Sequence, residues 1–352
     1  MYDGGAFMKA VARADLDEIV ECTEDLWRSL RGSSVFLTGA TGFFGVWLVS
    51  AFAHAERRLG LKIPLTILSR NPEAARARHG RILDEAGAEL VAGDARTFAF
   101  PSGTFTHVMH GATSASASLN TNNPTEMFDV IVSGTRRVLE FARIAGCTRF
   151  LLMSSGAVYG PQPSAMHRIA ESYGGGPPAL DVASAYAEGK RAAEQLSVIV
   201  AHASGFELTV ARGFAFVGPY LPLDTHFAIG NFIRDALAGG PVQILGDGTP
   251  YRSYMYGSDL ATWMWTLLAK GRAGAAYNVG SDDGRPLSEI AARVALATGA
   301  VVHVAKQASP GAPPARYVPD TSRARDELGL TTRVALDDAI RRTVGFHLAP
   351  WS

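Results

Sequence analysis

Residues 33–45 read SSVFLTGATGFFG, and this stretch decides the fold class of the chain. The run Val35 to Leu37 predicts a short strand, and Gly39, Gly42 and Gly45 follow it at a spacing of three. In a strand-to-helix turn, the first glycine allows a tight turn, the second lets backbone approach a pyrophosphate, and the third lets the helix pack closely on the strand. The helix N-terminus then faces the anion. The stretch therefore predicts a dinucleotide site.

Outward from this turn, strand-like runs alternate with helical segments as far as residue 215. We expect strands at 35–37, 65–68, 90–91, 107–109, 150–153 and 208–210, and helices at 44–55, 123–145 and 185–203. Strands that alternate with helices form parallel sheets covered on both faces. The predicted fold is α/β, with a Rossmann-type doubly wound parallel sheet over residues 33–215.

Two further regions flank this predicted domain. Residues 1–32 are expected to form an N-terminal helical extension, in which one amphipathic helix spans 15–30 and Asp15 and Glu18 form a capping box. From residue 216 to 352 the elements become shorter and turn residues more frequent, which indicates a smaller C-terminal α/β domain for the substrate. The proline-rich segment 307–320 is expected to be an ordered loop.

The composition excludes several classes of protein. The 352 residues include 33 basic and 33 acidic side chains, and a neutral chain lacks the basic excess that nucleic-acid binding needs. No apolar run approaches the roughly 20 residues that span a bilayer, and no signal peptide is apparent. Cys22 and Cys147 lie far apart, outside any disulfide or metal-binding spacing. We expect a cytoplasmic protein with no metal, membrane or nucleic-acid partner.

The end of the second predicted strand bears on the choice of dinucleotide. Where an NAD site offers an acid to the ribose hydroxyl, this chain has Ser69 and Arg70, a hydroxyl and a guanidinium suited to a 2′-phosphate. NADP is therefore slightly favoured over NAD, although Arg70 is also compatible with a merely solvated arginine. Asp94, after the third strand, is expected to accept a hydrogen bond from the adenine amine, beside Ala95.

Tyr186 and Lys190 lie four residues apart, which places both on one helix face. A nearby ammonium lowers the pKa of a phenol, so Tyr186 is expected to act as general acid and base while Lys190 also holds the nicotinamide ribose. Ser155 closes a buried strand, at the sheet edge where ligands gather. Ser154 and Ser155 are also compatible with plain capping of the strand end.

The ordered motifs TGATGFFG, HGAT, SSGAVYG, YAEGK and RSYMYGSDLA resemble those of the extended short-chain dehydrogenases/reductases of the NAD-dependent epimerase/dehydratase family. The resemblance implies nucleotide-sugar substrates and a first step in which tyrosinate removes the C4 hydroxyl proton and a hydride passes to nicotinamide. It implies that Ser155, Tyr186 and Lys190 are catalytic. Together with Tyr186 and Lys190, the expected dinucleotide-binding residues are Gly39, Thr41, Gly42, Phe43, Phe44, Gly45, Ser69, Arg70, Asp94 and Ala95.

Two positions after the serine bear on which branch of the family the chain resembles. The 4,6-dehydratases carry an Asp-Glu pair where this chain has Gly156 and Ala157, and UDP-glucuronate decarboxylases have Glu where Ala157 stands. Neither side chain can carry a proton, which favours epimerase or 4-ketoreductase chemistry. Glu171 and His167, on the loop 161–184, are possible substitutes.

Other motifs resemble the decarboxylase branch, among them YAEGKR, the run GNFIRDAL and the pair Arg252-Ser253. The expected substrate-binding residues are Ser114, Ser155, Asn231, Arg252 and Arg316, the two arginines being suited to a pyrophosphate or to surface ion pairs. The family usually has asparagine at two positions where this chain has Ile131 and Ala215, so substrate contacts there must differ.

The leading interpretation is therefore an NAD(P)-dependent nucleotide-sugar 4-epimerase. A 4-ketoreductase, or a decarboxylase or dehydratase with atypical acid/base groups, is the alternative within enzymes. A dinucleotide-sensing protein without turnover is the alternative of a different class, and the intact set of Ser155, Tyr186 and Lys190 argues against it. By analogy with the family, segments 125–145 and 184–203 are expected to pair in a homodimer.

Overall fold

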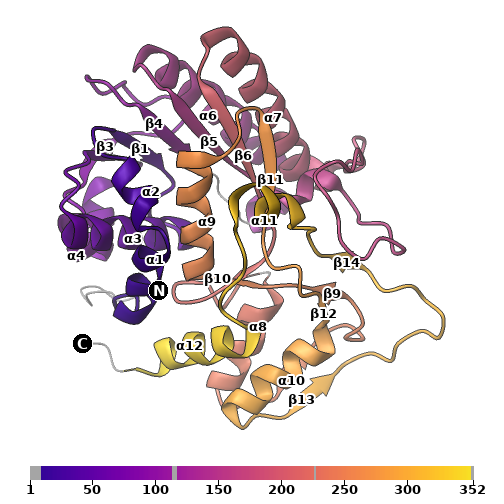
Figure 1. Cartoon of the computed structure of the whole chain (residues 1–352). Helices are drawn as coiled ribbons and strands as arrows, with labels where there is room; N and C mark the ends of the chain where they lie inside the picture. The colour runs from indigo at the N-terminus through magenta and orange to yellow at the C-terminus, as the bar shows by residue number, and fades with distance from the viewer. Residues whose placement is uncertain (1–8, 113–116, 226, 350–352) are drawn as a thin grey trace.

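The centre of the molecule is a parallel β-sheet. The computed structural model describes residues 9–112, 117–225 and 227–349, and Figure 1 shows their arrangement. Within these residues, seven strands form one sheet in the order β3-β2-β1-β4-β5-β6-β11, and all neighbours are parallel. The order in which the chain adds strands to the sheet reverses between β1 and β4, and sheets of this kind bind ligands at that point. The strands are β1 (Val35–Thr38), β2 (Leu65–Ser69), β3 (Glu89–Ala92), β4 (His107–His110), β5 (Arg149–Ser155), β6 (Glu207–Gly213) and β11 (Ala275–Val279).

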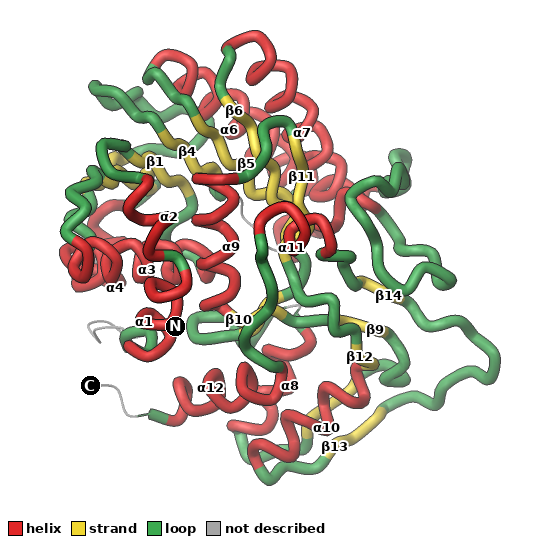
Figure 2. Tube along the Cα trace, viewed as in Figure 1, coloured by secondary structure: helices red, strands yellow, loops and turns green. Residues whose placement is uncertain are grey.

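Alternate residues of the strands enter two separate apolar cores, one on each face of the sheet. In β5, Leu151 and Met153 belong to one core, and Phe150 and Leu152 belong to the other. The first core is covered by α3 (Phe43–Leu59), α4 (Pro72–Glu85) and α9 (Gly257–Lys270), and the second by α6 (Pro124–Ile144) and α7 (Ala185–Ser204). Figure 2 shows these helices outside the strands. The prediction of a doubly wound sheet is confirmed.

All six predicted strands and all three predicted helices of this region are present. The seventh strand, β11, is a correction to the predicted boundary, because it lies within 216–352 but pairs with β6 from Ala275 to Val279. Helix α9 likewise packs on α3 and the sheet. The physical reason is that the open edge of β6 carries unpaired backbone groups, and a parallel strand satisfies them. The chain therefore returns to the first unit after entering the second.

The predicted N-terminal helix is wrong in detail. Two helices, α1 (Arg13–Cys22) and α2 (Glu24–Ser29), replace the single helix, and they separate at Thr23. Asp15 is inside α1 and does not cap it. Its buried carboxylate accepts hydrogen bonds from the Tyr256 hydroxyl at 2.8 Å and from Arg342 at 2.5 Å. Burial against the rest of the protein, not local capping, therefore decides the role of this residue.

The second unit is smaller and contains more loop (Figure 2). A three-stranded sheet in the order β12-β9-β14 joins β9 (Tyr251–Arg252), β12 (Arg285–Pro286) and β14 (Arg316–Tyr317). The segment 307–320 contains β14 and is otherwise mostly loop. The other elements after residue 215 are β7 (Phe216–Val217), α8 (Ala228–Leu237), β8 (Val242–Ile244), β10 (Met255–Tyr256), α10 (Leu287–Thr298), β13 (Val302–Val304), α11 (Ser322–Leu328) and α12 (Leu336–Leu348).

The remaining short helices are α5 (Ala117–Asn122), η1 (Gly156–Tyr159) and η2 (Val182–Ser184). Across the ranges that the structure describes, no helix is long and apolar enough to cross a membrane.

Candidate active site

The turn after β1 has the geometry that its glycines predict. Gly39 has φ +82°, and a β-carbon there would lie 2.6 Å from the carbonyl carbon of Gly111. The Thr38 hydroxyl accepts hydrogen bonds from the backbone N–H groups of Gly111 and Ala112 at 3.1 and 3.0 Å. These contacts fix the turn against the end of β4. Because of the positive φ and the close approach, Gly39 has no room for a side chain.

The start of α3 fits a pyrophosphate. A β-carbon on Gly45 would lie 2.2 Å from the backbone of Ala40, so the helix packs directly on the turn. A β-carbon on Gly42 would meet nothing closer than 3.9 Å, and no side chain caps this helix. Uncapped N–H groups at a helix start attract anions. Thr41 lies just before this helix start, and Phe43 and Phe44 are the first two residues of α3. A dinucleotide would bind at these uncapped N–H groups.

The ends of β2 and β3 carry the residues predicted to bind the adenosine. Ser69 is buried as the last residue of β2, and Arg70 is exposed immediately after it. Asp94 follows β3, and its carboxylate accepts hydrogen bonds from the Arg96 side chain at 2.9 and 3.2 Å. These bonds lower the pKa of Asp94. Ala95 is buried against helix α6, where its β-carbon would contact a side chain on Gly134.

Arg96 was not predicted as part of this region. Its guanidinium also binds Glu126 and Asp129 of α6 at 2.9 and 3.2 Å, so Asp94 belongs to a cluster of three carboxylates around one arginine. Arg96 lies only two residues after Asp94, and this short spacing was the available sequence signal for their ion pair.

Ser155, Tyr186 and Lys190 lie together at the end of β5. Ser155 is the last residue of β5, Tyr186 is in the first turn of α7, and Lys190 is one turn further on. The Lys190 ammonium donates a hydrogen bond of 2.8 Å to the carbonyl of Met153, two residues before Ser155. The Ser155 hydroxyl is close enough to the Tyr186 hydroxyl to lower the pKa of Tyr186. The structure thus brings the three predicted residues together.

The pKa values of the pair differ from our expectation. Burial raises the pKa of Tyr186, and the nearby Ser155 hydroxyl opposes that rise without cancelling it. Burial also lowers the pKa of Lys190 to about 8, a change that the charge of Glu194 opposes. Lys190 is therefore not what sets the pKa of Tyr186 in the protein alone, because its ammonium is directed to a backbone carbonyl and its own charge is disfavoured.

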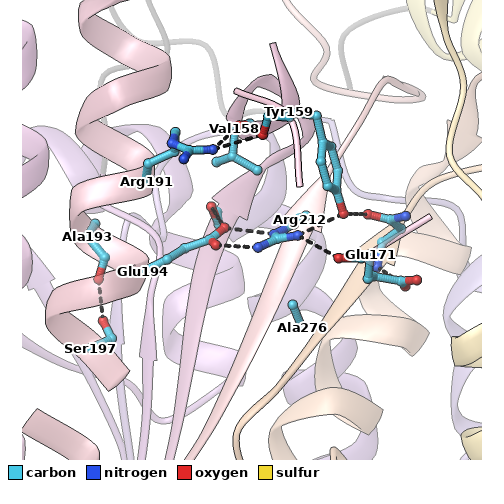
Figure 3. A network of polar contacts seen from close by, with 12 residues as sticks. Val158, Tyr159, Glu171, Arg191, Ala193, Glu194, Ser197, Arg212 and Ala276 are labelled. Carbon is cyan, nitrogen blue, oxygen red and sulfur yellow. Dashed lines mark hydrogen bonds and ion pairs between the residues drawn. The ribbon is translucent and has the colours of Figure 1, made fainter. Parts of the chain in front are cut away.

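Glu194, one turn after Lys190 in α7, belongs to a network of polar side chains (Figure 3). Arg212 of β6 forms two hydrogen bonds to the Glu194 carboxylate, at 2.6 and 3.0 Å, and one to the Tyr159 hydroxyl at 2.9 Å. Ser154 donates to Glu194 at 2.6 Å, which links the network to the residue before Ser155. The sequence analysis missed this network. Glu194 lies four residues after Lys190, and that spacing was the available signal.

Gly156 lies under two aromatic rings. A β-carbon on Gly156 would be 2.7 Å from the Tyr317 hydroxyl oxygen and 2.8 Å from the Phe214 ring. The Tyr317 and Phe214 rings lie 4.7 Å apart, centre to centre. A side chain at residue 156 would therefore displace one of these rings. The space over Gly156 is therefore filled by Phe214, which follows β6, and by Tyr317 of the second unit.

The predicted substrate residues lie in different places. Arg252 pairs in register with Tyr317 across β9 and β14, and its guanidinium lies 6.0 Å from the centre of the Tyr317 ring. Arg316 lies on the opposite side of β14, over the Tyr251 ring at 4.2 Å. Asn231 is on α8, where its amide oxygen accepts from Arg234 at 3.1 Å. Ser114 lies outside the described residues.

Four further residues that the sequence analysis singled out have structural surroundings of their own. Ile131 of α6 is buried, and its side chain fills the space beside Gly189 of α7, so it packs the two helices together. The Ala215 carbonyl accepts from Met255 N–H at 3.0 Å, which joins the two units. Glu171 accepts from the Asn278 N–H of β11 at 2.8 Å, and His167 is exposed. Glu171 is thus held at the polar network of Figure 3.

Comparison with known proteins identifies the family. The sequence model of the NAD dependent epimerase/dehydratase family matches residues 35–280. UDP-glucuronic acid decarboxylase 1 of Arabidopsis thaliana is 30% identical over 237 residues, which cover 67% of this chain and 54% of that relative. This chain thus matches about half the length of the Arabidopsis protein.

Two solved structures are similar over most of the chain. The structure of UDP-glucose 4-epimerase from Thermus thermophilus in complex with NAD has 25% sequence identity and a TM-score of 0.72, covering 90% of this chain and 100% of that one. MoeE5 in complex with UDP-glucuronic acid and NAD also has 25% identity and a TM-score of 0.72, covering 90% and 99%. The fold and the glycine turn define a dinucleotide-binding protein of Rossmann type. The chain belongs to the NAD dependent epimerase/dehydratase family.

Proposed function

We propose that this protein is an NAD(P)-dependent nucleotide-sugar 4-epimerase. The observation that carries the proposal is the contrast at the end of β5. Ser155, Tyr186 and Lys190 provide a proton-transfer set, whereas Gly156 and Ala157 carry no carboxylate and the space over Gly156 is filled by the rings of Phe214 and Tyr317. Oxidation of an alcohol and return of the hydride need one acid/base group, whereas elimination of water needs a further one.

Each residue has a defined task in this proposal. Tyr186 removes the proton of the sugar C4 hydroxyl as the C4 hydrogen leaves as hydride, and it returns that proton when the ketone is reduced on the other face. Ser155 donates a hydrogen bond to the substrate oxygen or to Tyr186, and Lys190 holds the nicotinamide ribose. Bound NAD(P) supplies the acceptor and donor of the hydride.

The binding residues follow from the same geometry. The glycine turn and the start of α3 bind the dinucleotide pyrophosphate, with Thr41, Phe43 and Phe44 around it, and Ser69, Arg70, Asp94 and Ala95 line the adenosine end. Arg70 is exposed at the end of β2, where a 2′-phosphate would lie, and this supports a preference for NADP. Arg252, whose guanidinium lies 6.0 Å from the centre of the Tyr317 ring, is the favoured contact for the nucleotide-sugar pyrophosphate, and Asn231 and Arg316 are the other proposed substrate contacts.

A decarboxylase is the second candidate, and a specific observation favours it. The Arabidopsis relative is named a UDP-glucuronic acid decarboxylase, and MoeE5 has been solved with UDP-glucuronic acid. A 4-ketone next to a carboxylated C5 can lose carbon dioxide with less help from acids and bases than elimination of water requires. A 4-ketoreductase is a third candidate, and it would use the same set of Ser155, Tyr186 and Lys190. A homodimer through α6 and α7, in the cytoplasm, completes the proposal.

A product analysis tests these candidates. The purified protein is incubated with UDP-glucose, UDP-glucuronic acid, UDP-N-acetylglucosamine and dTDP-glucose, each with NAD⁺ or NADP⁺, and products are followed by mass spectrometry and NMR. Unchanged mass with inverted C4 supports the epimerase. Loss of carbon dioxide or water overturns it in favour of a decarboxylase or dehydratase. Tyr186→Phe is the control, with turnover expected to fall by about 10²–10⁴-fold.

A further inference from the structure

The side chains of Thr38 and His110 meet where two neighbouring strands end. Thr38 is the last residue of β1, His110 is the last residue of β4, and the two are direct partners in the parallel register. Such partners carry their side chains on the same face of a sheet. The Thr38 hydroxyl oxygen lies 2.8 Å from Nδ1 of His110. Both residues are buried, with 1% and 3% exposure, so hydrogen bonds within the protein decide where their protons lie.

The other contacts of the Thr38 hydroxyl give this hydrogen bond its direction. The hydroxyl accepts from the backbone N–H of Ala112 at 3.0 Å and from that of Gly111 at 3.1 Å, and the Gly111 N–H is shared with the Thr38 carbonyl at 3.2 Å. A hydroxyl group has two lone pairs and one proton. Because two N–H groups point at the lone pairs, the proton is left for the third partner, His110. Nδ1 of His110 therefore accepts and carries no proton.

The second ring nitrogen of His110 faces helix α6. Nε2 lies 3.2 Å from the hydroxyl of Thr135, which is 1% exposed. A neutral imidazole has one protonated nitrogen, so Nε2 carries the proton and donates it to Thr135. We propose that His110, as the neutral Nε2–H form, is a positioning residue that holds the glycine turn, the turn after β4 and helix α6 in the arrangement that binds the dinucleotide. The inference rests on the proposed role of the glycine turn as the dinucleotide site.

The place of these bonds in the sheet connects them to the dinucleotide. Thr38 directly precedes Gly39, the first glycine of the turn, and β1 and β4 are the two strands between which the strand order reverses. A site that is already held in its bound arrangement avoids the cost of ordering its backbone when the ligand binds. The chain of bonds from Thr135 through His110 to Thr38 therefore affects affinity through the turn, without touching the ligand.

The surroundings favour the neutral ring that these bonds require. Burial lowers the pKa of His110 to about 3, and the charge of Lys190 adds to the lowering. An imidazolium would also point a second proton at the Thr38 hydroxyl, whose lone pairs already accept from two N–H groups. The ring therefore stays neutral in the folded protein at neutral pH.

The first test needs no variant that perturbs the fold. A two-bond ¹H–¹⁵N NMR spectrum of the full chain with ¹⁵N-labelled histidine reports which ring nitrogen is protonated, and the His110 signals are those that disappear in His110→Asn. We expect Nδ1 to resonate as an unprotonated nitrogen and Nε2 as a protonated one, without change from about pH 8 to about pH 5.5. A protonated Nδ1, in a neutral or a charged ring, would overturn the inference.

The second test measures binding of NAD⁺ and NADP⁺ by calorimetric titration. Thr38→Val removes the hydroxyl and should weaken both dinucleotides by about 10-fold, whereas Thr38→Ser restores it and should bind within about 2-fold of the wild type. Thr209→Val is the matched control, because Thr209 is a buried threonine of β6, three strands away from β1, and both affinities should stay unchanged. Wild-type affinity in Thr38→Val would overturn the positioning role.

A second pair of variants serves if Thr38→Val does not fold. His110→Asn keeps an acceptor near the position of Nδ1, whereas His110→Leu has none, so the asparagine variant should bind both dinucleotides at least about 5-fold more tightly than the leucine variant. Equal affinities in the two variants would count against the role of Nδ1. No nucleotide sugar takes part in any of these measurements. The epimerase proposal can therefore fail in the product analysis while the role of His110 stands, or the reverse.

Discussion

The Lys190 ammonium donates a 2.8 Å hydrogen bond to the Met153 carbonyl, which ties α7 to the end of β5. Lys190 is 5% exposed, so this bond holds a charged group in a nearly dry place. The contact fixes the distance between the helix that carries Tyr186 and the strand that carries Ser155. It also lowers the pKa of Lys190 indirectly, because the position it enforces is buried.

The buried lysine predicts a specific dependence of stability on pH. The folded-state pKa is about 8, and the unfolded value is 10.5. Between these two pH values the unfolded chain binds more protons than the folded protein, so the free energy of unfolding rises with pH by about 3 kcal/mol in total. Below pH 8 the full cost of burying the protonated lysine lowers the stability of the fold. Lys190→Met should lack this rise. Urea unfolding at about pH 7.5 and about pH 10.5 measures it.

The control for that experiment is Lys270→Met, at an exposed lysine in the last turn of α9. Wild type and Lys270→Met should show the same change between the two pH values, and Lys190→Met should differ from both. Equal pH dependence in all three proteins would contradict the assignment of a depressed pKa to Lys190.

The glycine turn predicts opposite outcomes for two neighbouring substitutions. Gly42→Ala places its β-carbon in open space, so the fold should be stable within about 1 kcal/mol, while dinucleotide affinity falls by roughly 10-fold or more because the pyrophosphate loses that space. Gly45→Ala drives its β-carbon into the Ala40 backbone and should destabilise the fold by about 2–3 kcal/mol. Thermal unfolding and calorimetric titration with NAD⁺ and NADP⁺ separate the two effects. Similar stability in both variants would refute the packing role of Gly45.

The ion pair between Arg212 and Glu194 predicts a large effect on stability. Its side chains are 17% and 13% exposed, so removing one partner leaves a charge with little access to water. Arg212→Met should destabilise the fold by about 3–5 kcal/mol, and the double variant Arg212→Met, Glu194→Met should recover part of that loss. Arg81→Met is the control, because the Arg81 and Glu85 pair is exposed and should contribute less than about 1 kcal/mol. If the double variant loses as much free energy of unfolding as Arg212→Met and Glu194→Met lose together, the two residues are not coupled.

The exposed guanidinium after β2 predicts the cofactor preference. Arg70→Ala should weaken NADP⁺ binding about 10-fold and leave NAD⁺ binding unchanged, because only the 2′-phosphate offers the arginine a charged partner. Arg76→Ala, at an exposed arginine of α4, is the matched control. Calorimetric titration of both dinucleotides measures the ratio. If Arg70→Ala changes neither affinity, Arg70 is a solvated strand-end residue and the preference for NADP fails.

The central sheet could be predicted from the sequence because its signals are local. Each strand from Val35 to Ala211 is a short apolar run, and each is bounded by residues that end strands, so period and composition sufficed. The glycine spacing at Gly39, Gly42 and Gly45 likewise predicted a turn whose close contacts the structure shows. The strand β11 was missed because its run of five residues follows a long excursion, and only the open edge of β6 makes it a strand of that sheet.

What the sequence determined by itself is the α/β class, the dinucleotide turn and the placing of Tyr186 and Lys190 on one helix face, because each depends on neighbours a few residues away. Tertiary structure alone decided the contacts of Asp15, Arg212 and Tyr317. Asp15 looked like a helix cap and is a buried acceptor for Tyr256 and Arg342. Tyr317 carried no local signal at all. Its position over Gly156 exists because β14 pairs with β9 and delivers a ring from the second unit to the end of β5.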